Sequence, residues 1–414
     1  MKIEKYTIGI GDRFACQGVA QLRALVQARA VGIDVCPAWN KSNREHLMIN
    51  SKPDDVRAEA DRAVAELGWN QPYYVDADHI NLKNVDAFIG ASDYYTIDVA
   101  DFIGEAADPD AVKAFVKEFR RYAGPFSVPG IDRKLELGNA DLEAAARRFL
   151  LAIQEAARIY RYIETNKGSD KFVAEISIDE TDTPRTPVEL FLILAMIGLE
   201  EIPVQMIAPK FASRFNKGID YAGDLRQFET EFAEDLSVIA FAVSEFQLPK
   251  TLKLSVHSGS DKFSLYPIIN RLLKTRPAGL HLKTAGTTWL EEVCGLAESG
   301  GEGLEVAKEI YVRAFERFHE LTEPYKTVID IDRSKLPDPK TVVGWGSEDY
   351  VNALRHGQAS PEYNPHLRQL LHVGFRVAAE MGERFTDALK ANEEIIARRV
   401  TENLFCRHLL PVFG

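Results

Sequence analysis

Cysteine is scarce in this chain of 414 residues. The four cysteines, Cys16, Cys36, Cys294 and Cys406, are widely spread and form no CxxC pair. This spacing argues against a disulfide framework and against a cysteine metal site. It favours free thiols in a reducing compartment, and we therefore expect a cytoplasmic protein.

Net positive charge and long hydrophobic runs are also missing. The formal net charge is -12, which argues against nucleic acid or an anionic membrane as a partner, because phosphate binding needs a basic face. The net charge does not exclude an anionic small molecule as a ligand, since a single pocket can be basic. The longest apolar run, residues 190–199, is too short to span a bilayer. The N-terminal stretch MKIEKYTIGIGDRF lacks the apolar core of a signal peptide, so we expect no membrane partner.

The chain does contain a regular alternation of short apolar segments and amphipathic segments. The amphipathic segments place apolar residues at spacings of three and four, which is typical of helices. Strand–helix alternation implies parallel strands, and eight such units imply an α/β fold of the (β/α)8 TIM-barrel type. A doubly wound open sheet is the alternative, but no GxGxxG motif follows an early strand, so a dinucleotide site is not expected. The strand candidates are residues 5–11, 32–38, 72–78, 94–100, 172–179, 203–208, 252–258 and 279–284.

The strand signals stop after about residue 300. The next segments with helical spacing are residues 305–319, 363–381 and 385–404. Residues 330–348 are rich in proline, glycine and charge, which is typical of a connecting loop. We therefore expect a TIM-barrel catalytic domain over residues 1–300 and a C-terminal helical extension over residues 301–414 that packs on the barrel.

Two of the predicted strands carry polar residues on one face. A strand turns alternate side chains to opposite faces, so Lys253, Ser255 and His257 share one face and the apolar residues between them share the other. His281 and Lys283 repeat this arrangement in the next strand. A strand that is buried only in a hydrophobic core would not carry polar residues along one face. We expect both stripes to face a polar site at the carboxyl ends of the barrel strands, where barrel enzymes place their sites.

Carboxylates and a further histidine stand at the ends of other predicted strands, namely Asp76, Asp78, His79 and Asp98. Histidines that converge with carboxylates suit a divalent metal ion such as Zn, Mn, Co or Ni. We assign the metal to Glu175, His257 and His281, with Asp179 or Glu180 as a further ligand. The alternative is that each histidine is a hydrogen-bonded structural residue and that the acidic pair at 179–180 forms loop charges or a helix cap.

Several longer strings resemble the motifs of the tagaturonate/fructuronate epimerase family, which interconverts these two sugar acids in hexuronate catabolism. The resemblance covers roughly residues 9–373 in the same order. It implies an isomerase of the epimerase type acting on an anionic sugar. The strings are DADH (76–79), TID (96–98), EISIDETDTPRTP (175–187), KGIDYAGDLRQFE (217–229), LSVHSGSDKFSLYP (254–267), HLKTAGTTWLE (281–291) and RQLLHV (368–373).

The chain also departs from the family pattern. It begins almost directly at the first strand, so the resemblance implies a shorter, divergent member without the N-terminal portion of familiar members. Gln21 stands where a histidine is expected, and the loops after Arg13, Pro37 and Ala208 differ. The strand-end residues are kept while pocket-edge loops change, which supports the chemistry more than the exact substrate.

The two sugar acids differ at C4, whereas enolisation of the C2 ketone acidifies C3. We therefore expect retro-aldol cleavage of the C3–C4 bond, rotation of the aldehyde fragment and re-addition, through a metal-bound enediolate. Asp76 and Asp98 are the acid/base candidates, and Asp179 is a further catalytic candidate. Arg13 and Lys283 would hold the substrate carboxylate or the enolate oxygen. The other substrate-binding candidates are His79, Gln205, Lys210, Lys253 and Ser258.

The main alternative is an isomerase or aldolase that acts on another ketose or sugar acid. In that case Lys253 or Lys283 would form a Schiff base inside the barrel. A barrel that only binds a sugar acid is disfavoured, because buried polar stripes cost free energy unless a ligand or hydrogen bonds satisfy them. The sequence does not decide whether the chain forms a homo-oligomer. It also does not assign a role to His372, which stands on an otherwise apolar helix face.

Overall fold

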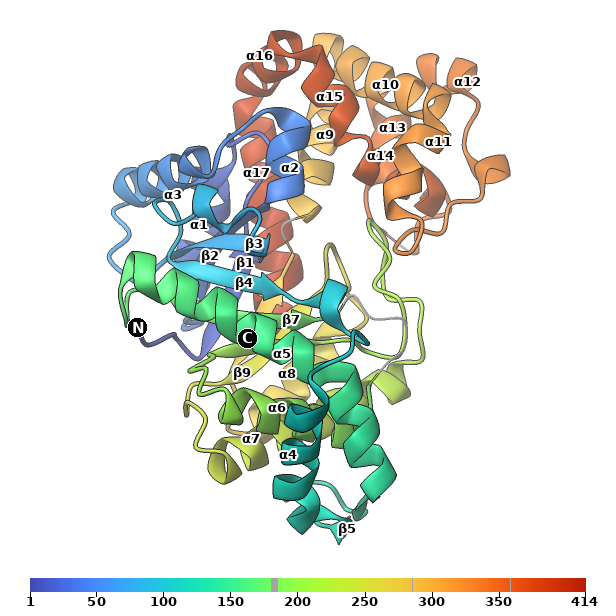
Figure 1. The fold of residues 1–414 in the computed structure, drawn as a ribbon. Helices are drawn as coiled ribbons and strands as arrows, with labels where there is room; N and C mark the ends of the chain where they lie inside the picture. The colour runs from blue at the N-terminus through green and yellow to red at the C-terminus, as the bar shows by residue number, and fades with distance from the viewer. Residues whose placement is uncertain (180–184, 285, 358) are drawn as a thin grey trace.

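Eight parallel strands close into a barrel in the computed structural model, which describes residues 1–179, 185–284, 286–357 and 359–414. Each strand pairs with its neighbours in the sequence, and the last pairs with the first, so the predicted (β/α)8 TIM barrel is confirmed. Figure 1 shows the barrel with the helices around it. The barrel strands are β1 (Tyr6–Ile10), β2 (Cys36–Ser42), β3 (Tyr74–Ile80), β4 (Tyr94–Asp98), β7 (Val173–Ile178), β8 (Met206–Pro209), β9 (Lys253–His257) and β10 (Leu280–Lys283).

All eight predicted strands are present, but β2 lies later than residues 32–38. The apolar residues Ile33 and Val35 are buried against the neighbouring helices from the loop that precedes the strand. The strand itself continues into polar residues and ends where Ser42 caps the short helix α2 (Asn43–Ile49). Apolar character alone therefore placed this strand too early.

Seven long helices of the described residues cover the outside of the barrel, as the strand–helix alternation predicted. Their starts carry side-chain caps in several cases; for example, Asp108 and Asp224 each accept hydrogen bonds from two backbone N–H groups of the first turn. The small antiparallel hairpin of β5 (Gly124–Phe126) and β6 (Leu135–Leu137) was not predicted from the sequence. The helices are α1 (Gly18–Ala30), α3 (Pro53–Leu67), α4 (Pro109–Phe119), α5 (Asn139–Lys167), α6 (Pro187–Leu199), α7 (Leu225–Glu245) and α8 (Tyr266–Thr275).

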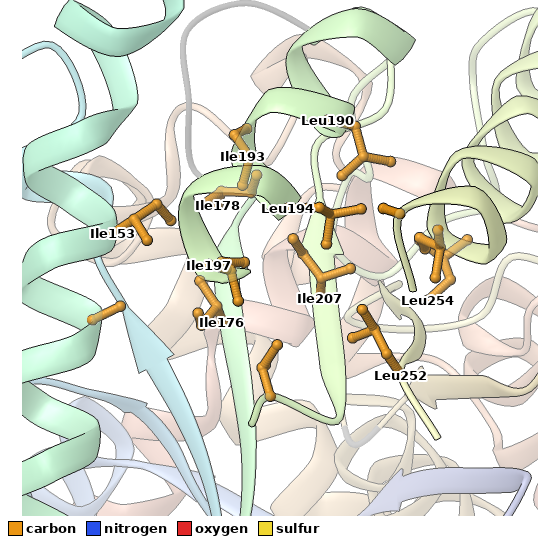
Figure 2. Close-up of a cluster of buried hydrophobic side chains, with 14 of the residues drawn as sticks. Ile153, Ile176, Ile178, Leu190, Ile193, Leu194, Ile197, Ile207, Leu252 and Leu254 are labelled. Carbon is orange, nitrogen blue, oxygen red and sulfur yellow. The ribbon is translucent and has the colours of Figure 1, made fainter. Parts of the chain in front are cut away.

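The main hydrophobic core lies between the strands and this helical layer. Figure 2 shows Ile193 of α6 next to Ile178 of β7, and Ile197 next to Ile176. Leu194 of α6 lies next to Ile207 of β8. Each such fully buried side chain contributes about 1.5–3 kcal/mol. The predicted alternation in β9 is confirmed, because its leucine and valine belong to this outer core while its polar residues face the barrel interior. The outer apolar faces thus leave the interior free for polar side chains.

The chain after β10 is helical, as predicted, and forms a second hydrophobic core around Trp289, Tyr311 and Tyr350. α17 packs on α1, and α15 packs on α2, which joins this extension to the barrel. Figure 1 shows α10 to α16 gathered at one end of the molecule, next to α2. The helices are α9 (Gly286–Ser299), α10 (Gly301–Glu316), α11 (Phe318–Thr322), α12 (Pro339–Val343), α13 (Ser347–Leu354), α14 (Pro365–Val373), α15 (Phe375–Met381), α16 (Glu383–Ala391), α17 (Glu393–Leu404) and α18 (Leu410–Phe413).

The predicted loop at residues 330–348 contains α12, which begins with a proline after the capping residue Asp338. The division of the chain at residue 300 stays a prediction. Among the helices of the described residues, none combines the length and the apolarity that crossing a bilayer requires.

Candidate active site

His257 is the centre of a polar cluster at the carboxyl ends of the barrel strands. Its Nε2 lies 2.5 Å from Glu175 Oε1, and its Nδ1 lies 3.1 Å from Asp179 Oδ2. Burial favours the neutral ring, but Asp179 and Glu175 outweigh it and raise the pKa of His257 to about 9. The polar stripe of β9 therefore ends in this polar cluster.

Lys283 binds a second group of carboxylates in the same cluster. Its Nζ lies 2.8 Å from Asp76, 2.7 Å from Asp78 and 3.6 Å from Glu175. Burial disfavours the ammonium, yet these carboxylates raise the pKa of Lys283 above its usual value, so the side chain stays charged. The neighbouring strand β1 has a glycine, Gly9, beside this lysine. A β-carbon at that position would lie only 3.0 Å from Lys283 Cγ, so a larger residue would crowd the lysine side chain.

Asp76 differs from the other carboxylates of the cluster. It is buried, and Thr96 donates a hydrogen bond of 3.0 Å to it. Burial raises the pKa of Asp76 to about 7, against the opposing effect of Lys283. By contrast, His257 and Lys283 hold the pKa of Glu175 below its usual value although burial acts to raise it. A carboxyl group with a pKa near neutrality is suited to proton transfer in either direction.

His79 enters the cluster through an irregularity at the end of β3. The pairing of β3 with β4 shifts register between Ala77 and Ile80, and His79 has a left-handed φ of 55°, which non-glycine residues rarely adopt. Its ring centroid lies 5.7 Å from that of His257. One ligand atom each of His79, Asp179 and His257 lie within 4.8 Å of one another, which makes this trio a candidate metal site.

Three predicted site residues make their hydrogen bonds deeper in the barrel, below this cluster. Lys253 Nζ donates a hydrogen bond of 2.7 Å to the carbonyl oxygen of Glu4 and one of 2.9 Å to Thr7 Oγ1. His281 Nδ1 lies 2.7 Å from the same Thr7 hydroxyl. Gln205 Oε1 accepts a 2.8 Å hydrogen bond from the backbone of Ala174. These partners belong to the lower barrel, toward the amino ends of the strands.

The other predicted residues lie at the rim. Ser258 Oγ donates a hydrogen bond of 2.5 Å to the carbonyl oxygen of Lys283. Asp98 accepts a hydrogen bond of 3.0 Å from the backbone N–H of Ala100. Arg13 lies 3.1 Å from Glu45 and stacks on the ring of Phe375. Lys210 directly follows β8 and is half-buried. Glu180 lies outside the described residues.

Comparison with known proteins decides the family. A model of the tagaturonate epimerase family matches residues 1–410. The chain belongs to the tagaturonate epimerase family. It is therefore an isomerase of the epimerase type, which confirms the resemblance in the motif strings.

Relatives of this epimerase agree with the assignment. The tagaturonate/fructuronate epimerase of Thermotoga maritima is 28% identical over 416 residues, covering 96% of this chain and 79% of that protein. Two glycerol-bound crystal structures of the fructuronate-tagaturonate epimerase UxaE from Cohnella laeviribosi have TM-scores of 0.82 and 0.81. Both are 25% identical and cover 100% of this chain and 82% of theirs.

Sequence reasoning missed one contributor to the epimerase cluster, Tyr94, which donates a hydrogen bond to Glu175. Tyr94 stands at an inward position of β4, so the alternation of residues could have found it. Ser177, which the alternation places on the same face of β7 as Glu175 and Asp179, donates a hydrogen bond to Asp179. The part that His79 plays in the candidate metal site could not be found this way, because the register shift in β3 sets its direction.

Proposed function

We propose that this epimerase interconverts tagaturonate and fructuronate by inverting C4 of the ketohexuronate with the help of a divalent metal ion. The observation that carries the proposal is the group of His79, Asp179 and His257, whose ligand atoms lie within 4.8 Å of one another at the barrel mouth. The Lys283 and Asp76 pair lies in the same cluster. The names of the relatives from Thermotoga and Cohnella supply the substrate pair.

The donor set fits a divalent ion such as Zn, Mn, Co or Ni. Two imidazoles and one carboxylate are ligands that these ions accept, and all three side chains are partly shielded from solvent. An ion held there would supply Lewis acidity to the C2 ketone and the C3 hydroxyl. This set shares only His257 with the trio expected from the sequence; Glu175 contacts His257, and His281 binds Thr7 instead.

The residues of the chain then account for the bond changes. A carboxylate takes the proton of the C4 hydroxyl, the C4–O bond becomes a carbonyl, and the electron pair of the C3–C4 bond moves to an enediolate of the three-carbon fragment. Asp76 suits this step because its pKa of about 7 lets it accept and return a proton. The ammonium of Lys283 neutralises negative charge beside it. Asp98, at the end of the neighbouring strand β4, is our candidate for proton transfer on the opposite face of the rotated aldehyde.

A Schiff-base mechanism is disfavoured by the state of both barrel lysines. Lys283 keeps its proton because of its carboxylate partners. Burial lowers the pKa of Lys253 to about 7, but Lys253 binds Glu4 and Thr7 below the cluster. We therefore expect borohydride reduction in the presence of tagaturonate to leave the mass of the protein unchanged. A stable adduct on either lysine in peptide mass spectrometry would support an aldolase of the Schiff-base class instead.

The substrate is tested by following product formation with NMR. The metal-loaded protein is incubated with tagaturonate, with fructuronate, and with tagatose and its 6-phosphate as matched ketoses. We expect each uronate to convert into the other and the two remaining ketoses to react far more slowly. Faster epimerisation of the phosphate would assign the site to another sugar class.

A further inference from the structure

His372 is a buried histidine that the proposed chemistry does not use. It stands on α14 of the helical extension and is 1% exposed. Its Nε2 atom has no hydrogen-bond partner among the described residues. A buried polar atom without a partner costs free energy, so its retention needs a reason.

Cationic side chains surround this ring. Burial, followed by Arg13, Lys217, Lys262 and Arg368, lowers the pKa of His372 well below its usual range. The imidazole is therefore neutral, and its free nitrogen can carry a proton and donate it. Three of the cations come from loops that follow the barrel strands β1, β8 and β9, and the fourth lies on α14 itself. The ring thus lies where the extension meets the barrel mouth.

The backbone of Gly218 holds the loop after β8 directly against α14. Gly218 has a φ of +80°, and a β-carbon there would lie 3.3 Å from His372 Cβ and 3.2 Å from the carbonyl oxygen of Arg368. Arg368 Nε donates a hydrogen bond of 2.6 Å to the carbonyl oxygen of Gly218, and the N–H of Gly218 donates one of 2.9 Å to Ser260 Oγ. A side chain at position 218 would push the loop off the helix, which explains the glycine.

This contact brings the loop cations close to the metal candidates. A β-carbon at Gly259 would lie 3.9 Å from Lys217 Nζ. Gly259 is two residues after His257, a backbone span of at most about 7 Å. Lys262 follows on the same loop, and its Nζ donates 3.0 Å to Ser260 Oγ. A six-carbon substrate placed at His257 can therefore reach this region.

Two of the cations near His372 have carboxylate partners among the described residues. Arg368 is paired with Asp261 at 2.8 Å, and Arg13 with Glu45 at 3.1 Å. Lys262 is fully buried, and its Nζ donates hydrogen bonds to Ser260 Oγ at 3.0 Å and to the carbonyl oxygen of Asp261 at 3.1 Å. Burial accordingly lowers the pKa of Lys262 to about 7. An anion bound here would accept a hydrogen bond from the free imidazole nitrogen, beside the cations named above.

We propose that His372, Lys217 and Lys262 form the subsite that receives the carboxylate of the sugar acid, and that the helical extension thereby selects uronates over neutral ketoses. The inference rests on the proposed function, because it takes the ketohexuronate as the substrate. The carboxylate carbon is three bonds from C3, so one end of the molecule lies at the metal candidates while the other lies under α14. The imidazole N–H donates to a carboxylate oxygen, and the positive charges of Lys217 and Lys262 stabilise the bound carboxylate.

The test compares a charged and a neutral substrate in variants of the subsite. Lys217→Met and His372→Gln are assayed on tagaturonate and on tagatose, which carries CH2OH in place of the carboxylate. We expect kcat/KM for tagaturonate to fall about 10- to 100-fold in each variant, the usual effect of one hydrogen bond to a charged group. The value for tagatose should change less than about threefold. Lys217→Arg, which keeps the charge, should restore most of the activity, and Lys390→Met on the exposed surface is the matched control.

Equal losses on both substrates in Lys217→Met and His372→Gln would overturn the subsite while leaving the proposed function intact. Absence of tagaturonate conversion by the unchanged enzyme would instead overturn the proposed function. A binding measurement separates folding from recognition: tagaturonate should raise the melting temperature of the unchanged enzyme more than that of His372→Gln, with the unliganded melting temperatures compared first. An equal rise in both proteins would also contradict the subsite.

Discussion

His79→Ala and His257→Ala are each expected to lose the bound divalent ion, about one per chain, and to lower kcat/KM for tagaturonate by about 10³-fold or more. The magnitude follows from the several kcal/mol of charge stabilisation that a Lewis-acidic ion supplies. His79 and His257 each contribute one ligand atom to the only trio within 4.8 Å found among the described residues. Metal content is measured on the purified variants by elemental analysis, alongside activity.

His281→Gln is the matched comparison for this experiment. His281 belongs to the set expected from the sequence, but it binds Thr7 in the lower barrel. We expect His281→Gln to keep its metal ion, whatever its effect on stability. If His281→Gln loses the ion while His79→Ala keeps it, the trio of Glu175, His257 and His281 is the metal site and the geometric assignment is wrong.

Asp261→Ala is expected to lower the free energy of unfolding by about 3–5 kcal/mol, the usual cost of removing one partner from a buried ion pair. Asp261 is fully buried in the loop after β9. Arg368 donates 2.8 Å to one carboxylate oxygen, and Thr287 donates 2.8 Å to the other. His356 and His408 also lie within 3.3 Å of it. Without Asp261, the charge of Arg368 would stay buried without compensation.

This prediction is measured by urea denaturation. Since whole domains are stable by only about 5–15 kcal/mol, the loss should be visible as a large shift of the midpoint. Asp110→Ala is the control, because its ion pair with Lys113 is exposed and should change stability by less than about 0.5 kcal/mol. A loss below about 1 kcal/mol for Asp261→Ala would mean that this network does not hold the extension to the barrel.

The barrel could be predicted from the sequence because its signals are local. Each strand and helix shows its own periodicity, and the polar stripe of β9 shows which face looks inward. The direction of His79 depends on a register shift between two strands, and the partner of His281 is the hydroxyl of Thr7 on β1, which pairs with β10 but lies far away in the sequence. Neither feature has a local signature, so the candidate metal trio could not be predicted from spacing alone.

In the C-terminal helical extension, too, the helices could be predicted from the sequence but their contacts with the barrel could not. Its helices follow from apolar spacing, but the contact of Gly218 with α14 joins segments about 150 residues apart. The sequence therefore indicated that His372 stands on an apolar helix face without indicating which cations surround it. The HSGSDKF string has a structural part as well, since its aspartate, Asp261, anchors the extension through Arg368.

Conversion of tagaturonate in deuterium oxide by the metal-loaded enzyme tests the central claim most directly. Cleavage and re-formation of the C3–C4 bond removes only the hydroxyl proton at C4, so the hydrogen on the C4 carbon never exchanges with solvent. We predict that proton NMR will show fructuronate with hydrogen retained at C4, and that removal of the metal with a chelator will stop the reaction. Deuterium at C4, or unchanged turnover after metal removal, would contradict this account.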